Sequence, residues 1–328
     1  MKPYQKIGKR IIKLLNGTVN LAVLILLLLL LVFGSYSMWD SHKVYQVADS
    51  NQYAMYKPTN EETQGFEELK ALNSEVIAWL TVYGTNVDYP VAQDKDNSKY
   101  VNTDIKGKYS LSGALFLDYQ NAPDFSDFNS IIYGHHMDKQ VMFGGIESFA
   151  DKDYFEARRY GNLFHSGRDY GLEFFAFMHV DAYDFTIYTV SIANDRRQAF
   201  IDNLYEKATN TRDIGVTIDD NILLLSTCTS DSTNGRHILA ARILDETFAN
   251  AFPTGGDEGG LGIGGIDDQS GVTILDRIPL WGWIVLWILL LLLIFIIIDG
   301  IRDVTRKGKK KDKKESEKDE QKADNEED

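Results

Sequence analysis

The chain is expected to form a mainly β domain, an eight-stranded barrel with peripheral helices, flanked by two transmembrane helices. Short apolar or β-branched segments recur between residues 76 and 244, separated by Gly, Asn and Asp turns. Many short strands of this kind predict a closed or nearly closed barrel. Two long apolar runs near the ends of the 328-residue chain predict the membrane helices.

The first membrane helix is expected over residues 18–38. This segment contains a run from Val19 to Phe33 in which Asn20 is the one polar side chain, and residues 1–17 before it carry five basic side chains and no acid. Its length suffices to cross a hydrocarbon core of about 30 Å. A cleaved signal peptide has a similar charged start, but this run is long for one and is followed by a weak cleavage pattern. An uncleaved anchor is therefore favoured.

The second membrane helix is expected over residues 278–298, with three tryptophans toward its outer end. Aromatic side chains at the headgroup level are typical of a spanning helix. Residues 299–328 follow as a charged tail that begins with basic side chains and ends with acidic ones. Because basic residues lie on the terminal side of both runs, the positive-inside rule predicts a two-pass protein of the cell membrane with both termini in the cytoplasm.

The charge of the region between the membrane runs excludes some partners. The formal net charge is −14 overall, +5 in residues 1–17 and −1 in residues 299–328, which leaves −18 for the rest. Such acidity argues against nucleic-acid binding, which needs a basic face. The chain has one cysteine, so no intramolecular disulfide forms and the core must hold the fold.

The external region is expected to hold one domain between two tethers. Residues 39–61 are polar and tyrosine-rich and predict a stalk, while residues 62–250 suffice for one well-buried core. Residues 251–277 are rich in glycine and predict a flexible linker. Within the domain, apolar spacing predicts helices over residues 66–72 and 195–208, the second covering one barrel edge. Strands are predicted over residues 78–82, 87–91, 113–117, 130–133, 173–179, 185–190, 222–227 and 237–244.

Three chemically capable residues stand at strand ends. Cys228 ends the apolar run that begins at Asn221, His135 ends the run from Ile131, and Arg236 begins the next strand. A thiol attacks as its thiolate, so a neighbouring imidazole is needed as its partner. An arginine keeps its charge and offers several donors, which suits an oxyanion. Gly134 is expected to let the backbone turn sharply, so that the imidazole projects from the strand end.

Other residues compete for the same roles. His136 is the alternative imidazole and Arg242 the alternative arginine, although Arg242 lies deeper in its strand. Taken singly, a histidine is more often a core or surface residue and an arginine more often a surface ion pair. The histidines are dispersed, and adjacent histidines of a strand point to opposite faces, so no metal site is expected. No cofactor is expected either.

These residues resemble the sortases of Gram-positive bacteria, and class B among them. Residues 224–228 look like the family's Thr-Leu-x-Thr-Cys signature, with Leu224 in place of the first threonine. Residues 132–135, with Met137 and residues 142–144, are similar to the class B histidine segment, with His136 where the family usually has asparagine. Further similarity runs through residues 66–69, 84–91, 96–102 and 112–118, and the helix over 195–208 is similar to the class B insertion.

The resemblance implies an eight-stranded sortase barrel and makes residues 62–250 an extracellular catalytic domain. It also implies a cysteine transpeptidase without a metal or cofactor. Cys228 would cleave the C-terminal sorting signal of a surface protein or pilin through a thioester, with Arg236 on the oxyanion and His135 protonating the leaving amine. An amine from a cell-wall precursor or a pilin lysine would then resolve the thioester.

The resemblance also implies substrate-contacting residues and leaves two questions open. By alignment these residues are Asn97, Val101, Ser226, Ile187 and Tyr188. Wall anchoring and pilus polymerisation are both open, and the second membrane run favours polymerisation by analogy with pilus-building relatives. The alternative function is a catalytically silent scaffold or binding protein built on the same barrel.

Overall fold

The computed structural model describes residues 3–59, 62–228, 234–252, 287 and 291. Two compact units are present, residues 40–265 and residues 1–39 with 266–328, and each is described by itself. The expected linker over 251–277 lies outside the described residues from 253 onward, as does the second membrane helix except for Trp287 and Leu291. The charged tail over 299–328 lies outside them as well.

One long helix, α1 (Pro3–Ala48), contains the first apolar run. Within the described part of the chain, the stretch Gly17–Tyr56 is long and apolar enough to cross a membrane. A signal sequence meets the same test of length and composition. The helix is therefore a possible membrane anchor.

Nine strands of the described residues form one sheet in the order β5-β1-β2-β3-β4-β8-β9-β6-β7. An additional pairing of β5 with β6 closes eight of them into a barrel, and β7 extends the sheet beyond β6. The pairs β2–β3 and β4–β8 are parallel, and all others are antiparallel. The strands are β1 (Val76–Val82), β2 (Asp88–Ala92), β3 (Leu115–Leu117), β4 (Asn129–Gly134), β5 (Tyr160–His165), β6 (Arg168–Asp181), β7 (Ala208–Thr211), β8 (Asn221–Cys228) and β9 (Gly235–Leu244).

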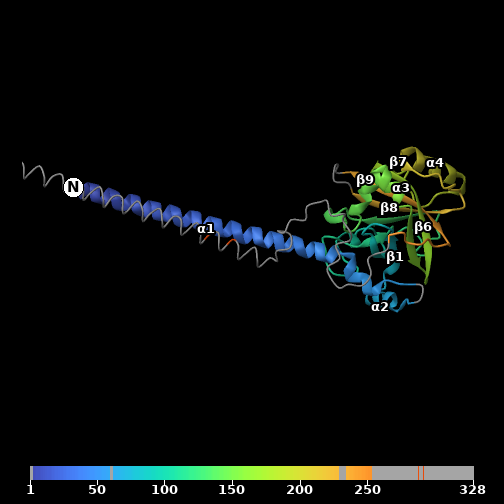
Figure 1. Ribbon diagram of the computed structural model, residues 1–328, viewed down its shortest axis with the longest axis horizontal. Coiled ribbons are helices and arrows are strands. Elements are labelled where there is room, and N and C mark those ends of the chain that lie inside the picture. The colour runs from blue at the N-terminus through green and yellow to red at the C-terminus, as the bar shows by residue number, and fades with distance from the viewer. Residues whose placement is uncertain (1–2, 60–61, 229–233, 253–286, 288–290, 292–328) are drawn as a thin grey trace, which may run out of the picture. The chain divides into compact units, whose positions relative to one another are not determined.

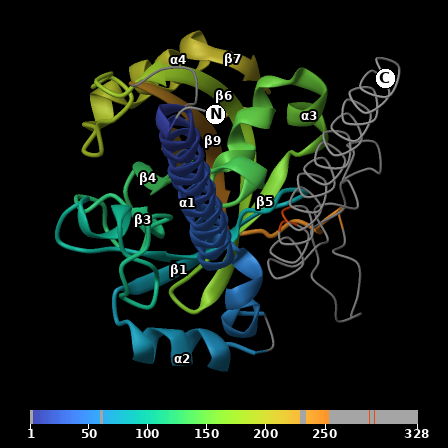
Figure 2. The ribbon, with the colours of Figure 1, turned by 90° about the vertical axis from the view of Figure 1, so that its left-hand side faces the viewer.

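Short helices surround the barrel. In both views, α4 and β7 lie on one side of it and α2 lies on the opposite side (Figures 1 and 2). The helices after α1 are η1 (Ser50–Tyr56), α2 (Gln64–Leu72), η2 (Lys99–Val101), η3 (Asp138–Gln140), η4 (Gly144–Ala150), α3 (Lys152–Ala157), η5 (Asn194–Arg196) and α4 (Arg197–Lys207).

The eight-stranded barrel with peripheral helices is confirmed, and so are the two helices expected within the domain. The prediction of a strand over residues 185–190 was wrong, because this segment is a series of turns. The Asp184 carboxylate accepts hydrogen bonds from the Thr186 amide and hydroxyl, and the Asp184 carbonyl accepts one from the Ile187 amide. Local bonds of this type compete with strand pairing.

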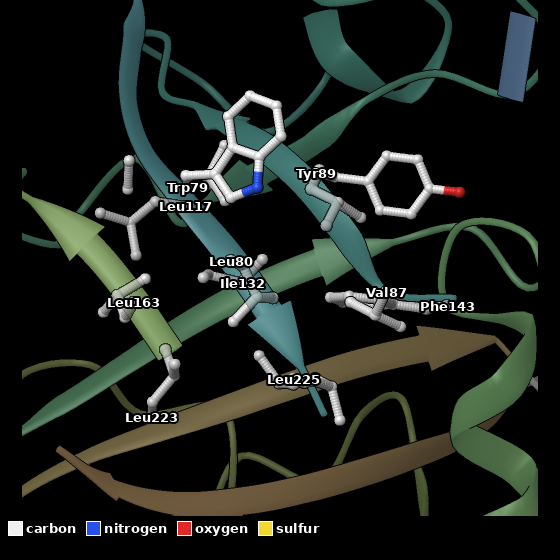
Figure 3. Packing of buried hydrophobic residues seen from close by; sticks show 14 of the residues in the cluster. Trp79, Leu80, Val87, Tyr89, Leu117, Ile132, Phe143, Leu163, Leu223 and Leu225 are labelled. Carbon is white, nitrogen blue, oxygen red and sulfur yellow. The ribbon is translucent and has the colours of Figure 1, made fainter. Parts of the chain in front are cut away.

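Apolar side chains pack in two clusters on the two faces of the sheet. The barrel core fills the interior, and Figure 3 shows part of it. The outer core lies between the sheet and α4, which buries Phe200, Ile201 and Leu204 there. Since alternate strand residues face opposite sides, β8 contributes to both clusters, and this explains its unbroken apolar run. Leu223 and Leu225 belong to the barrel core, and Ile222 and Leu224 to the outer core.

The segment expected as a polar stalk is partly built into the domain. Helix α1 continues to Ala48, and η1 follows immediately. Ala48 and Tyr53 are buried in the barrel core, and the Tyr89 hydroxyl donates a hydrogen bond of 2.8 Å to the Ala48 carbonyl. The last residues before the barrel are therefore packed against it.

His165 at the end of β5 makes stability depend on pH. Its ring is 4% exposed and stacks on Tyr170 at 4.1 Å. Burial lowers the pKa of His165 to about 4, against an opposing effect of Asp124 and with a smaller contribution from Arg168. Between pH 6.5 and 4 the unfolded chain binds the proton that the folded chain excludes, so the free energy of unfolding falls as pH falls.

We expect His165 alone to make the domain about 3 kcal/mol less stable at pH 4 than at pH 7.5. Urea denaturation of the wild type and of His165→Phe measures this, because phenylalanine keeps an aromatic ring at the site and cannot titrate. The difference in unfolding free energy between the two proteins should change over this pH window. A constant difference from pH 7.5 to 4 would contradict the assignment.

Candidate functional site

Three adjacent strands bring the three candidate residues to the same end of the barrel. In the parallel pair β4–β8, Gly134 pairs with Thr227, so that His135 and Cys228 each follow by one residue. In the antiparallel pair β8–β9, Cys228 pairs with Arg236. The backbone thus aligns His135, Cys228 and Arg236 side by side on β4, β8 and β9. The side chain of Cys228 and residues 229–233 lie outside what the structure describes.

A backbone carbonyl determines the protonation of the His135 ring. Its Nε2 atom lies 2.7 Å from the carbonyl oxygen of Val101. Because a carbonyl only accepts hydrogen bonds, Nε2 carries a proton and Nδ1 is the nitrogen left to exchange one. The adjacent His136 is engaged elsewhere, with its Nε2 atom 2.9 Å from Oε2 of Glu147.

The turn that carries Val101 is held by contacts of the neighbouring Tyr100 and Gly113. The Tyr100 hydroxyl donates to Oε2 of Glu75 at 2.5 Å and accepts from the Asn73 amide at 2.8 Å. Gly113 lies against the same turn with φ of +57°, where an added Cβ would be 2.7 Å from the Val101 oxygen. Val101 itself is half-buried against the barrel core. It thereby offers the imidazole a fixed acceptor.

Gly134 serves the site by close packing. Its φ is not in the left-handed region, so the expected sharp turn is not the reason for glycine here. An added Cβ would lie 2.4 Å from Leu115 and 2.7 Å from Phe143. The amide of Phe143 donates a hydrogen bond of 3.0 Å to the His135 carbonyl. Phe143 therefore packs against Gly134 and also holds the backbone of the histidine.

The structure separates the two candidate arginines. Arg242 lies within β9 and its Nη2 atom is 2.7 Å from Oε2 of Glu173, a carboxylate that Arg159 also binds at 2.6 Å. Arg236 is at the strand end, half-buried, and its Nη1 atom donates to the adjacent Gly235 carbonyl at 2.8 Å. Arg242 is therefore engaged in a buried ion pair, whereas Arg236 lies beside the Cys228 backbone.

Three of the expected substrate residues belong to one connected polar row. The Tyr188 hydroxyl and Ser226 Oγ share a hydrogen bond of 2.9 Å. The Tyr188 ring stacks on Tyr133 at 6.4 Å, and the Tyr133 hydroxyl donates to Asp118 at 3.0 Å. Asn97 donates to the same carboxylate oxygen at 2.8 Å. The polar row therefore runs from Ser226 on β8 to Asn97 in the loop before η2.

The remaining expected substrate residue has a packing role. Ile187 has no exposed surface and belongs to the outer core with Phe200 and Leu204. The Ile187 side chain therefore has no surface that a ligand could contact. It fixes the turn that carries Tyr188, the next residue.

Sequence reasoning missed the two residues at the centre of the polar row. Tyr133 precedes Gly134 in the histidine segment, and Asp118 ends a segment whose family resemblance was recognised. Burial, followed by the nearby Asp118 carboxylate, raises the pKa of the Tyr133 hydroxyl, which therefore stays a donor. Their partnership joins β4 to the loop after β3, so only tertiary structure reveals it.

The described residues contain no group of three or more metal-ligating side chains that could hold a metal ion. The residues that the strand register brings together are a cysteine, a histidine and an arginine. Residues of these three types with aligned backbones suit acyl transfer by a covalent route, in which the thiol is the nucleophile.

The chain is similar to known proteins in sequence and in fold. The family model described as Sortase domain matches residues 80–244. Sortase B of Staphylococcus aureus is 26% identical over 237 residues, 67% of this chain and 94% of that protein. Sortase B of Listeria monocytogenes is 30% identical over 179 residues, 54% of this chain and 73% of that protein. A crystal structure of a Streptococcus pyogenes class B sortase involved in pilus biogenesis is 37% identical with a TM-score of 0.51, covering 54% of this chain and 97% of that one.

Proposed function

Because this chain belongs to the sortase family, class B, we propose that it is a cysteine transpeptidase in which Cys228, His135 and Arg236 perform the chemistry. The observation that carries the assignment is the register of β4, β8 and β9, which aligns these three residues at one end of the barrel. The silent scaffold considered from the sequence has no feature of the described site in its favour.

In the first half-reaction, the Cys228 thiolate attacks the carbonyl carbon of a threonine in a C-terminal sorting signal. The guanidinium of Arg236 stabilises the oxyanion of the tetrahedral intermediate. The intermediate collapses as the C–N bond breaks, and His135 gives its Nδ1 proton to the departing amine. A thioester between the peptide and Cys228 results.

In the second half-reaction, an amine attacks the thioester carbon and the S–C bond breaks. His135 takes the proton that the amine loses, and Cys228 returns to the thiolate. The Val101 carbonyl holds Nε2–H throughout, so the same nitrogen, Nδ1, serves as acid and then as base. The ring does not need to rotate between the two steps.

For the substrate contacts we propose Asn97, Val101 and Tyr188. Ser226 is 2% exposed and Ile187 is fully buried, so these two residues support Tyr188 and do not offer a surface of their own. The polar row gives Asn97 and Tyr188 a common support, because both are connected to Asp118, Asn97 directly and Tyr188 through Tyr133. An extended peptide lying along this row would meet donors and acceptors already held in place, which lowers the entropic cost of binding.

For the location we propose a two-pass membrane protein with both termini in the cytoplasm and residues 39–277 outside. The apolar part of α1 supports the first anchor, and the basic flanks of both apolar runs support the orientation.

Pilin polymerisation is the reaction we favour over wall anchoring. The similarity to a class B sortase involved in pilus biogenesis supports this choice.

The proposed function is tested with the full chain in detergent micelles and peptides that end in different sorting signals. A productive peptide should leave a thioester adduct visible by intact-mass spectrometry, and hydroxylamine should release it. Adding a pilin domain with an accessible lysine or a wall peptide with a free amine distinguishes the two acceptors. If no peptide acylates the protein while the thiol stays reactive, the transpeptidase assignment is wrong.

A further inference from the structure

The end of the membrane-proximal helix touches the loop that follows His135. We call residues 45–56, the last turn of α1 and η1, the juxtamembrane segment. The Tyr45 hydroxyl donates to the Asp138 carboxylate at 3.4 Å, and Lys139 Nζ lies 4.8 Å from the centre of the Tyr45 ring. Both partners belong to η3, three and four residues after the histidine.

The same segment touches the loop that follows Val101. Lys106 Nζ lies 5.6 Å from the centre of the Tyr53 ring and 5.7 Å from that of Tyr56. Cation–π contacts of this kind are attractive, because the face of an aromatic ring carries partial negative charge. The juxtamembrane segment thus contacts the loops adjoining both partners of the His135–Val101 hydrogen bond.

A buried tyrosine makes the closest connection. The Tyr89 hydroxyl donates to the Ala48 carbonyl at 2.8 Å and accepts from the Met142 amide at 3.0 Å. The next residue, Phe143, donates its amide to the His135 carbonyl. Figure 3 shows the Tyr89 ring at the margin of the barrel core with its hydroxyl turned away from the other labelled side chains. One phenol therefore joins the end of α1 to the histidine segment.

The loop that Tyr89 holds is conformationally strained. Lys139, Gln140 and Met142 have φ values of 60°, 57° and 52°, in the left-handed region that non-glycine residues rarely adopt. Such a backbone persists only where its surroundings determine it. Without the phenol, the buried Met142 amide and Ala48 carbonyl would both lose a partner. The loop would then be expected to relax.

We propose that Tyr89 is a positioning residue for His135 and that the juxtamembrane segment is a structural part of the reaction centre. The membrane-proximal helix then stabilises the loop from 137 to 143, and this loop keeps the imidazole aligned with Val101. The catalytic part of this inference rests on the proposed function of His135. The structural part, that the phenol holds the loop, does not.

The test compares Tyr89→Phe with Tyr83→Phe in the full chain in detergent micelles. Tyr83 is a matched control, because its hydroxyl also donates to a backbone carbonyl, that of Phe248, at 3.2 Å and away from the histidine. Hydrogen exchange of residues 135–143 should become at least about 10-fold faster in Tyr89→Phe and stay unchanged in Tyr83→Phe. The kcat of peptide transfer should fall about 10-fold or more in Tyr89→Phe, with KM within about 2-fold.

Unchanged exchange of residues 135–143 in Tyr89→Phe overturns the inference, and so does an equal loss of kcat in the two variants. If Tyr89→Phe does not fold, Tyr45→Ala replaces it, because it removes only the contact at the loop surface. Faster exchange of residues 137–140 is then expected, and no change overturns the inference. Should the wild type transfer no peptide, the proposed function fails while the exchange measurement still decides the role of Tyr89.

Discussion

Cys228→Ala is expected to lower the rate of peptide transfer by about 10⁴-fold or more, because the proposed route has no step without the sulfur. No adduct should appear in the mass spectrum of this variant with a peptide that acylates the wild type. The chain has one cysteine, so iodoacetamide should modify the wild type once and the variant not at all. Unaltered thermal unfolding of the variant shows that the loss is chemical.

Two further variants separate the roles in the same assay. Arg236→Ala should still form a slow thioester, with kcat reduced about 10²–10³-fold, because one oxyanion donor is lost. His136→Asn should transfer peptide at nearly the wild-type rate, because His136 is bound to Glu147 and not to Val101. An adduct that forms in Cys228→Ala would remove the nucleophile assignment, and a larger loss in His136→Asn than in His135→Asn would exchange the two imidazoles.

Arg242→Met is expected to lower the free energy of unfolding by about 3 kcal/mol. Glu173 is 5% exposed, and removing one arginine leaves its carboxylate with only the more exposed Arg159 as an ionic partner. Removing one partner of a buried ion pair is destabilising, because Arg159 alone is left to balance the buried carboxylate of Glu173. Urea denaturation in micelles at pH 7 measures this loss.

The matched control is Arg236→Met, which makes the same chemical change on the same strand. Arg236 has no carboxylate partner among the described ion pairs, so the loss of stability should stay below about 1 kcal/mol. The two variants should show opposite patterns, with Arg236→Met losing activity and Arg242→Met losing stability. Joint replacement Glu173→Leu with Arg242→Met should recover part of the stability, because it removes the buried carboxylate that Arg159 alone would balance. Equal loss of stability in Arg236→Met and Arg242→Met would assign both arginines to structure.

Local patterns predicted most of the fold. Strand segments such as 222–227 and 237–244 carry period-two or fully apolar patterns that persist in β8 and β9. A strand was wrongly predicted over residues 185–190, because β-branched and aromatic residues are frequent in this segment. The hydrogen bonds of Asp184 hold it in turns. Strands β5 and β7 were missed because their apolar pattern is weak, and pairing with β6 forms them.

The sequence predicted the residue types of the candidate site, but not the residues that hold their side chains in place. Cys228 and His135 are recognisable because each stands at a strand end within a segment of family resemblance, and Arg236 because it begins the next strand. The partners that hold them come from elsewhere in the chain: Val101 for the imidazole, Glu173 for the competing Arg242, and Asp118 for Tyr133. The hydrogen bond between His135 and Val101 joins residues 34 positions apart, so the pattern of neighbouring residues around each of them does not predict it.

The sequence by itself determined the β class of the domain, the apolar run of α1 and the acidity of the region between the two apolar runs. It also determined the three candidate residue types, because composition and periodicity are properties of neighbouring residues. Tertiary structure decided the closure of β5 on β6, the tautomer of His135 and the packing of the juxtamembrane segment against Tyr89. Each of these joins segments distant in the chain, and only the packing of the whole barrel brings such segments within hydrogen-bonding distance.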